Sequence, residues 1–300
     1  MTAGGTGPAG PATLVQRVGV VGCGLMGSGI AEISARAGLD VVVREVDEDA
    51  VAAGRERIET SMARAVRRGK LAAEEAGAAL GRLQYTTDLG EMAGRQLVIE
   101  AVTESEVAKL EVFAALDKVV ADPDAILASN TSSIPIMRLA MATGRPGQVV
   151  GLHFFSPVPV LKLVELVPSL MTTEATVTRA RDVAEQVLDK RVIISKDRAG
   201  FVVNALLIPY IISAIRMLES GFATEEDIDS GMVLGCNHPM GPLALADFIG
   251  LDTTRAAAQS LYDEFKEPLY APPPLLARMV EAGLLGRKTG RGFYPYEPAA

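Results

Sequence analysis

A lone histidine and a lone carboxylate stand out in the stretch GLHFFSPVPVLKLVELVP, residues 151–168. His153 is one of two histidines in the chain, and Glu165 follows it after a run of mostly apolar residues. An unpaired carboxylate is costly to bury in such surroundings, whereas pairing it with the imidazole would orient the ring and stabilise its protonated form. The pair could then act as a general base and its partner. Taken alone, a histidine at the end of an apolar strand is more often a satisfied core residue.

The segments that must position these residues are typical of a sheet domain, from Arg17 to about Ser195. Seven short apolar runs alternate there with Ala-rich helical stretches: RVGVVG, DVVVRE, QLVIEAV, AILASN, VVGLHF, LVELV and RVIIS. Continuous apolar strands separated by helices indicate βαβ units, with the strands buried on both faces of a mostly parallel sheet. In such sheets ligands gather at the carboxyl ends of the strands, and His153 ends one of them.

Two helical regions complete the predicted architecture. Residues 49–83 have no strand pattern, and apolar residues recur there at helical spacing, which predicts a helical pair inserted in the sheet domain: Val51, Ile58, Met62 and Val66. After the stretch SKDRAGFVVN the chain is helical and broken by Gly and Pro, so we expect an all-α second domain. The predicted boundaries are a tail at 1–13, a nucleotide-binding domain at 14–196 and a helical domain at 197–300.

A glycine motif, Gly22-x-Gly24-x-x-Gly27, lies between the first predicted strand and a helix. In that setting the first glycine makes a tight turn, the second admits a pyrophosphate, and the third lets helix and strand pack closely. The second strand ends at Glu45, about 20 residues further, where a carboxylate binds the adenosine ribose diol and repels a 2′-phosphate. The motif predicts a doubly wound Rossmann domain that prefers NAD, although Arg44 beside Glu45 leaves NADP open.

Composition excludes several other classes of protein. The net charge of -8 and the pI near 5.0 disfavour nucleic acid or an anionic membrane as a partner. The two cysteines, Cys23 and Cys236, have no metal-ligand spacing, so we expect neither a metal site nor a disulfide framework, and a reducing cytoplasm fits. The apolar runs are too short or too interrupted to span a bilayer.

Seven blocks in order give the chain a family resemblance: GVVGCGLMGSGIA, LVIEAVTESEVAKLEVFAALD, ASNTSSIPI, GLHFFSPVPVLKLVELV, DRAGFVVNALLIPY, HPMGPLALADFIGLDT and GRKTGRGFYPY. Together they resemble the 3-hydroxyacyl-CoA dehydrogenases, most closely the bacterial enzymes that act on 3-hydroxybutyryl-CoA. The similarity runs from about Val15 to Tyr296, nearly the whole chain. It implies NAD-dependent, reversible oxidation of an (S)-3-hydroxyacyl-CoA to the 3-oxoacyl-CoA, and a helical domain through which the protein forms a homodimer.

The resemblance also assigns roles to individual residues. It implies that His153 is the general base, with Glu165 as its partner, since removing hydride from a secondary alcohol requires a base for the hydroxyl proton. Ser132 and Asn204 match positions that hydrogen-bond the substrate oxygen or hold the surroundings of the histidine. Cofactor contacts are implied for Leu25, Met26, Glu104, Lys109, Asn130 and Ser132, of which Glu104 and Lys109 match residues around the nicotinamide ribose. Ser61 and Arg68, on the helical pair, fall where the family contacts CoA.

One position departs from the family pattern, and three other interpretations stay open. Ser156 stands in HFFSP where the family usually has asparagine, which can change how the loop after His153 is held or which acyl chain it accepts. The same chemistry on a carrier-bound or polar 3-hydroxyacyl group is the nearest alternative. A dehydrogenase of free 3-hydroxy acids would rely on a helix lysine, and the His153–Glu165 pair argues against it. A nucleotide-binding protein without catalysis is the third, because fold alone does not define activity.

Overall fold

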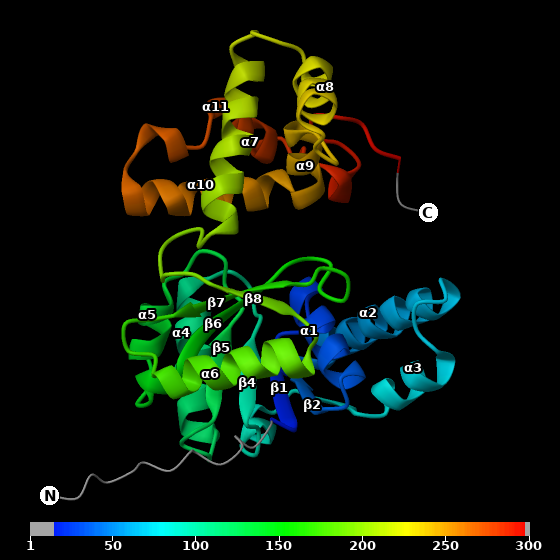
Figure 1. Ribbon diagram of the computed structural model, residues 1–300, viewed down its shortest axis with the longest axis vertical. Coiled ribbons are helices and arrows are strands. Elements are labelled where there is room, and N and C mark those ends of the chain that lie inside the picture. The colour runs from blue at the N-terminus through cyan, green and yellow to red at the C-terminus, as the bar shows by residue number, and fades with distance from the viewer. Residues whose placement is uncertain (1–14, 298–300) are drawn as a thin grey trace, which may run out of the picture. The chain divides into compact units, whose positions relative to one another are not determined.

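A computed structural model describes residues 15–297 and divides the chain into two units, Met1–Asp197 and Arg198–Ala300 (Figure 1). The predicted tail at residues 1–13 lies outside the described residues. Within residues 15–297, no helix is both long and apolar enough to cross a membrane.

The first unit is built on one eight-stranded sheet with the order β3-β2-β1-β4-β5-β6-β7-β8. Its strands are β1 (Arg17–Val21), β2 (Asp40–Arg44), β3 (Leu83–Thr86), β4 (Leu97–Glu100), β5 (Ile126–Ser129), β6 (Val149–Phe154), β7 (Leu163–Pro168) and β8 (Arg191–Ile194). Neighbouring strands are parallel except for β6 and β7, which pair antiparallel. The order 3-2-1-4-5-6 is that of a Rossmann sheet, so the predicted fold class is confirmed.

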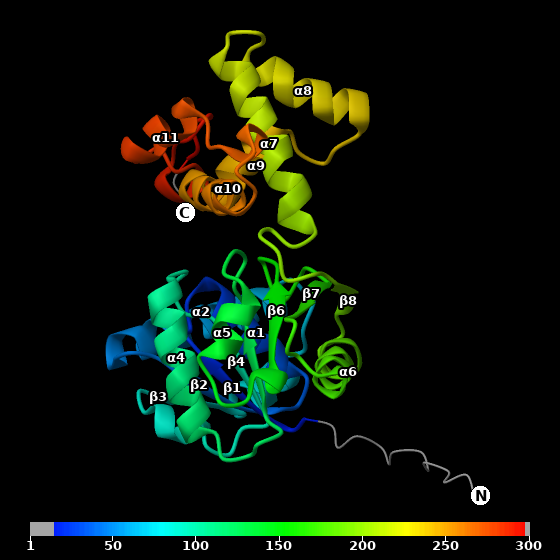
Figure 2. The same ribbon diagram turned by 90° about the vertical axis from the view of Figure 1, so that its left-hand side faces the viewer.

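Helices cover both faces of this sheet. They are α1 (Leu25–Arg36), α2 (Glu48–Arg67), α3 (Ala73–Leu80), α4 (Glu106–Val119), α5 (Ile136–Met141) and α6 (Glu174–Asp182). Buried residues of α1, α2, α3 and α6 join alternate strand residues in one apolar cluster. Figure 2 shows α4 and α5 on the side of the sheet opposite to α6. Because the helices cover only the two faces of the sheet, the loops at the ends of the strands are the place where a site can form.

One strand was missed. The span 49–83 was predicted to hold a helical pair without a strand; α2 and α3 form that pair, but β3 follows them at the sheet edge. Its four residues, LQYT, include only one buried side chain, Leu83, because an edge strand has a neighbour on one side only. A strand that is short and half-exposed has no continuous apolar run to reveal it.

The second unit is all-α, as predicted. Its helices are α7 (Val203–Glu219), α8 (Glu225–Cys236), α9 (Pro242–Ile249), α10 (Leu251–Phe265) and α11 (Pro274–Glu281). Two buried carboxylates organise its chain: Asp229 accepts hydrogen bonds from the amides of Leu243 and Ala244 at the start of α9. Asp247 accepts them from the amides of Phe293 and Tyr294, so the last residues pack back onto the helices.

Candidate active site

His153 and Glu165 face each other across the antiparallel pair of strands β6 and β7. They are register partners in β6 and β7, and Nδ1 of His153 lies 2.6 Å from Oε2 of Glu165. Both side chains are buried, at 6% and 0% exposure. The Phe155 ring, 4.6 Å from the imidazole between centroids, adds an apolar wall. The contact with the carboxylate turns the Nδ1 side of the imidazole towards Glu165 and so fixes the orientation of the ring.

Asn130 holds the end of the strand that carries His153. Its side-chain oxygen, directly after β5, accepts a hydrogen bond of 2.9 Å from the backbone N–H of Phe154. Asn130 was predicted to contact the cofactor, and here it ties the carboxyl ends of β5 and β6 together. It is thus a positioning residue for the histidine next to Phe154.

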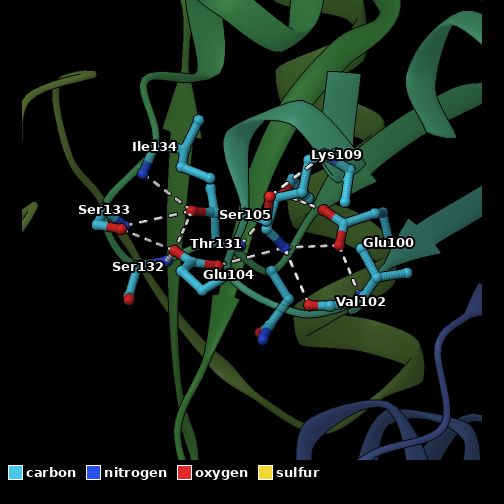
Figure 3. A network of polar contacts seen from close by, with 12 residues as sticks. Glu100, Val102, Glu104, Ser105, Lys109, Thr131, Ser132, Ser133 and Ile134 are labelled. Atoms are coloured by element: carbon cyan, nitrogen blue, oxygen red, sulfur yellow. Dashed lines mark hydrogen bonds and ion pairs between the residues drawn. The ribbon is translucent and has the colours of Figure 1, made fainter. Parts of the chain in front are cut away.

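A buried ion pair lies at the carboxyl end of β4 (Figure 3). Lys109, on α4 and 1% exposed, donates to Oε1 of Glu100 at 2.6 Å and to the carbonyl of Val102 at 3.3 Å. The second oxygen of Glu100 accepts a hydrogen bond of 2.6 Å from the hydroxyl of Ser129. Lys109 also lies 3.3 Å from Oε2 of Glu104. Its ammonium group is thus surrounded by oxygen atoms, which makes burial of the charge tolerable.

Glu104 joins this ion pair to the loop after β5. Its Oε1 accepts hydrogen bonds from the hydroxyls of Thr131 and Ser133, at 2.5 and 2.8 Å, and from the amide of Ser132 at 3.0 Å. Burial alone would raise the pKa of Glu104, but the Lys109 ammonium and these three donors together lower it below its ordinary value. Figure 3 shows the Ser132 hydroxyl pointing away from the network. The loop that carries Ser132 is therefore held by an ionised carboxylate.

Four members of this network were not singled out in the sequence: Glu100, Ser129, Thr131 and Ser133. Glu100 had a usable signal, because it is a carboxylate within the apolar run QLVIEAV, as Glu165 is within LVELV. The hydroxyl residues had none, since serine and threonine are common in loops for local reasons. Lys109 was taken either for a ribose contact or for an exposed helix residue; its burial excludes the exposed position.

The glycine loop has the shape that a dinucleotide requires. Gly22 has φ +93°, which L side chains rarely adopt, and a Cβ on Gly27 would lie 1.8 Å from the carbonyl oxygen of Gly22. No atom lies within 4 Å of a Cβ position on Gly24, so its backbone is open to an approaching pyrophosphate. Glu45 reaches this loop and accepts a hydrogen bond from the amide of Cys23. The shape of this loop fits NAD.

A pocket of about 510 Å³ lies between α1, α2 and the loop after β6. Ser61, from α2, and Ser156, from the loop, both line it, and so does Leu25 at the start of α1. Met26 instead packs partly against the sheet core, and Arg68 caps the end of α2 outside the lining of this pocket. The structure thus brings Ser61 and Ser156 together and leaves Arg68 apart.

Asn204 is the second residue of α7, in the second unit. The remaining predicted site residues all belong to the first unit: Glu165 lies within β7, and the others lie at or after the carboxyl ends of strands, or on or next to α1, α2 and α4.

Both units match descriptions of one enzyme family. Residues 17–198 match the 3-hydroxyacyl-CoA dehydrogenase NAD binding domain, and residues 200–296 match the 3-hydroxyacyl-CoA dehydrogenase C-terminal domain. The chain belongs to the 3-hydroxyacyl-CoA dehydrogenase family. The predictions of this family and of an NAD-dependent dehydrogenase are confirmed.

Individual members of the 3-hydroxyacyl-CoA dehydrogenase family are similar to this chain over almost their full length. The 3-hydroxybutyryl-CoA dehydrogenase of Mycobacterium tuberculosis is 61% identical over 282 residues, 94% of this chain and 99% of that protein. The human mitochondrial hydroxyacyl-coenzyme A dehydrogenase is 40% identical over 291 residues, 95% of this chain and 92% of that one. The crystal structure of (S)-3-hydroxybutyryl-CoA dehydrogenase PaaH1 from Ralstonia eutropha matches with a TM-score of 0.89 at 44% identity, covering 94% of this chain and 99% of that one.

Proposed function

We propose that this dehydrogenase interconverts (S)-3-hydroxyacyl-CoA and 3-oxoacyl-CoA with NAD, and that short substrates such as 3-hydroxybutyryl-CoA are preferred. The buried His153–Glu165 contact carries the proposal, because it gives an alcohol oxidation the base that it needs. Bound NAD supplies the hydride acceptor. Relatives named as 3-hydroxybutyryl-CoA dehydrogenases, at 44 to 61% identity, support the short acyl chain.

The proton is handled by His153. Because Nδ1 faces Glu165, Nε2 is the nitrogen that takes the proton of the substrate hydroxyl during oxidation and returns it during reduction. Glu165 stabilises the imidazolium that forms, and burial of both side chains keeps water away from the charge. Ser132 and Asn204 hydrogen-bond the substrate oxygen in this proposal.

The other site residues bind and orient the two ligands. Glu104, held by Lys109 and the loop after β5, binds the nicotinamide ribose, and Glu45 binds the adenosine ribose. Ser61 contacts the CoA portion from its place in the pocket. Residues 14–196 form the NAD-binding domain and residues 197–300 a helical domain for substrate binding and dimerisation.

A homodimer in the cytoplasm completes the proposal. Large apolar side chains of the second unit support a partner there, since Leu206, Phe222 and Leu234 are 74%, 79% and 84% exposed. A partner subunit that covers these side chains would remove their apolar surface from water.

The test is NADH consumption with acetoacetyl-CoA, with free acetoacetate, and with NADPH in place of NADH. We expect rapid turnover of the thioester with NADH alone, and a loss of about 100-fold or more in kcat for His153→Ala with NADH binding retained. Full activity in that variant would contradict the role of His153. Turnover of neither substrate by the intact protein would favour a carrier-bound or polar acyl group, with Ser156 in the pocket as its determinant.

A further inference from the structure

The ammonium group at the carboxyl end of β4 has two carboxylates beside it, and it is shared unequally between them. Figure 3 shows Lys109 between Glu100 and Glu104. The Lys109 ammonium lies 2.6 Å from Oε1 of Glu100 but 3.3 Å from Oε2 of Glu104. Two negative charges attract the same cation, and the closer contact is the stronger one. Glu100 therefore draws the ammonium away from Glu104.

The two carboxylates differ in what they can still bind. Glu100 is 0% exposed, and its oxygens accept hydrogen bonds from Lys109, from the amide of Val102 at 2.7 Å and from the hydroxyl of Ser129 at 2.6 Å. Both of its oxygens thus have donors within the protein. The side chain of Glu104 is 39% exposed. Its three hydrogen-bond donors all meet Oε1, whereas Oε2 has the more distant ammonium as its partner, so Oε2 has room for a further donor.

A ribose diol needs such an open acceptor. Its hydroxyl groups donate to a carboxylate oxygen, and the bond is stronger when the carboxylate keeps its charge. An ammonium hydrogen-bonded to the same oxygen would compete with the diol and offset that charge. If Glu100 lost its charge, Glu104 would be the remaining carboxylate beside Lys109, and the ammonium would be drawn to Oε2.

We propose that Glu100 is a positioning residue of the cofactor site, which acts through Lys109 to keep Oε2 of Glu104 available to the nicotinamide ribose. The proposal rests on the function proposed above, in which Glu104 binds that ribose. Glu100 itself does not touch the cofactor. The buried ion pair then has a second role besides stability, because it decides which acceptor the ligand meets.

Two ligands isolate the nicotinamide ribose experimentally. ADP-ribose carries this ribose, and ADP ends before it. Isothermal titration calorimetry on the full chain gives Kd for each, and we call the ratio of Kd for ADP to Kd for ADP-ribose the ribose preference. Binding of these ligands requires no turnover, so the measurement does not depend on which acyl substrate the enzyme accepts. A general loosening of the site would raise both Kd values and leave the ribose preference unchanged.

We expect Glu104→Gln to lower the ribose preference about fivefold and Glu100→Gln to lower it about threefold. Glu106→Gln is the matched control: it removes an exposed carboxylate, paired with Arg138, at the start of α4, and should leave the preference unchanged. Glu100→Asp keeps the charge but ends one methylene short of Lys109, so it should lower the preference by less. This second variant serves if Glu100→Gln does not fold.

Steady-state kinetics adds a separate readout. In Glu100→Gln, KM for NADH should rise, while KM for acetoacetyl-CoA at saturating NADH should stay within about twofold of the parent. A loss of folded protein would move neither KM value.

The outcomes separate this proposal from the one on which it rests. A lower ribose preference in Glu104→Gln, with no change in either Glu100 variant, would overturn the positioning role alone. Equal weakening of ADP and ADP-ribose binding by Glu100→Gln would also overturn it, because the role would then be structural. An unchanged preference in Glu104→Gln would mean that Glu104 does not bind the ribose, and both proposals would be wrong.

Discussion

Each unit buries carboxylates, but the two units compensate them in different ways. In the first, Glu165 contacts His153 and Glu100 contacts Lys109, so each acid has a basic partner within 2.6 Å. In the second, Asp229 and Asp247 accept hydrogen bonds from backbone amides and tyrosine hydroxyls. The first arrangement holds charge at the ends of strands, where chemistry can use it; the second closes the chain on itself.

The pKa values of Glu104 in the first unit and Asp247 in the second move in opposite directions. Burial tends to raise the pKa of both Glu104 and Asp247. For Glu104, the nearby Lys109 ammonium and three donors reverse the effect. For Asp247, donors from the last residues of the chain are not enough, and the charge of Asp229 adds to burial, so its pKa stays raised. The nearby ammonium thus favours the ionised form of Glu104, whereas Asp247 has hydrogen-bond donors but a second carboxylate, Asp229, near it.

The comparison predicts its largest effect in kcat. Glu165→Gln keeps a hydrogen-bonding group beside His153 but removes the charge, so we expect kcat to fall about 100-fold or more with a small change in KM. Asp247→Asn, the matched change in the second unit, should leave kcat within about twofold. Steady-state assays at saturating NADH measure kcat for both variants. Similar losses of kcat in the two variants would contradict the proposed difference between the carboxylates of the two units.

The next effect is on stability. Lys109→Met leaves Glu100 buried without its cation, which we expect to lower the free energy of unfolding by about 3–5 kcal/mol. Lys118→Met, on the exposed side of the same helix, should change it by less than about 0.5 kcal/mol. Urea unfolding of both variants measures the two changes in the free energy of unfolding. A loss of less than about 1 kcal/mol for Lys109→Met would show that the ion pair contributes little.

A smaller loss is expected in the second unit. Asp247→Asn replaces one acceptor oxygen by an amide donor that faces Tyr294 or Phe293 N–H groups, costing about 1–3 kcal/mol at neutral pH. Asp263→Asn, at an exposed carboxylate, is the control and should leave the melting temperature unchanged. Thermal unfolding of the two proteins compares them, and equal melting temperatures would contradict a structural role for Asp247.

The smallest effect is a difference in pH dependence. The lowered pKa of Glu104 gives stability that is present above its unfolded pKa and lost as pH falls through the folded value. The raised pKa of Asp247 gives stability that is present below its unfolded pKa and lost as pH rises through the folded value. Acidification from about pH 7 towards pH 4 should therefore shrink the advantage of the parent over Glu104→Gln and increase it over Asp247→Asn. Parallel pH profiles of unfolding free energy would refute this.

Sequence reasoning worked where a polar residue stood in apolar surroundings or where glycines had fixed spacing. His153, Glu165 and Gly22 were found in this way, and the fold class followed from the alternation of apolar runs with helical stretches. It failed for β3, which has only one buried side chain and therefore no apolar run. It also failed for Glu100, which was assigned to a strand but not recognised as a member of the ion-pair network. The hydroxyls that hold Glu104 come together only through the pairing of β4 with β5, a contact between distant segments that no local pattern contains.

The antiparallel pairing of β6 with β7 separates two properties that an enzyme would otherwise have to change together. The backbone ladder sets His153 opposite Glu165, and a slip of one residue would turn the acid to the other face of the sheet. The connecting residues, 155–162, take no part in that ladder, yet four of them, residues 156–159, line the pocket between α1 and α2. Substitutions and length changes in this connection can therefore alter which substrates fit while the proton-transfer pair stays in register, so selectivity can evolve, or be engineered, in one hairpin without disturbing its chemistry.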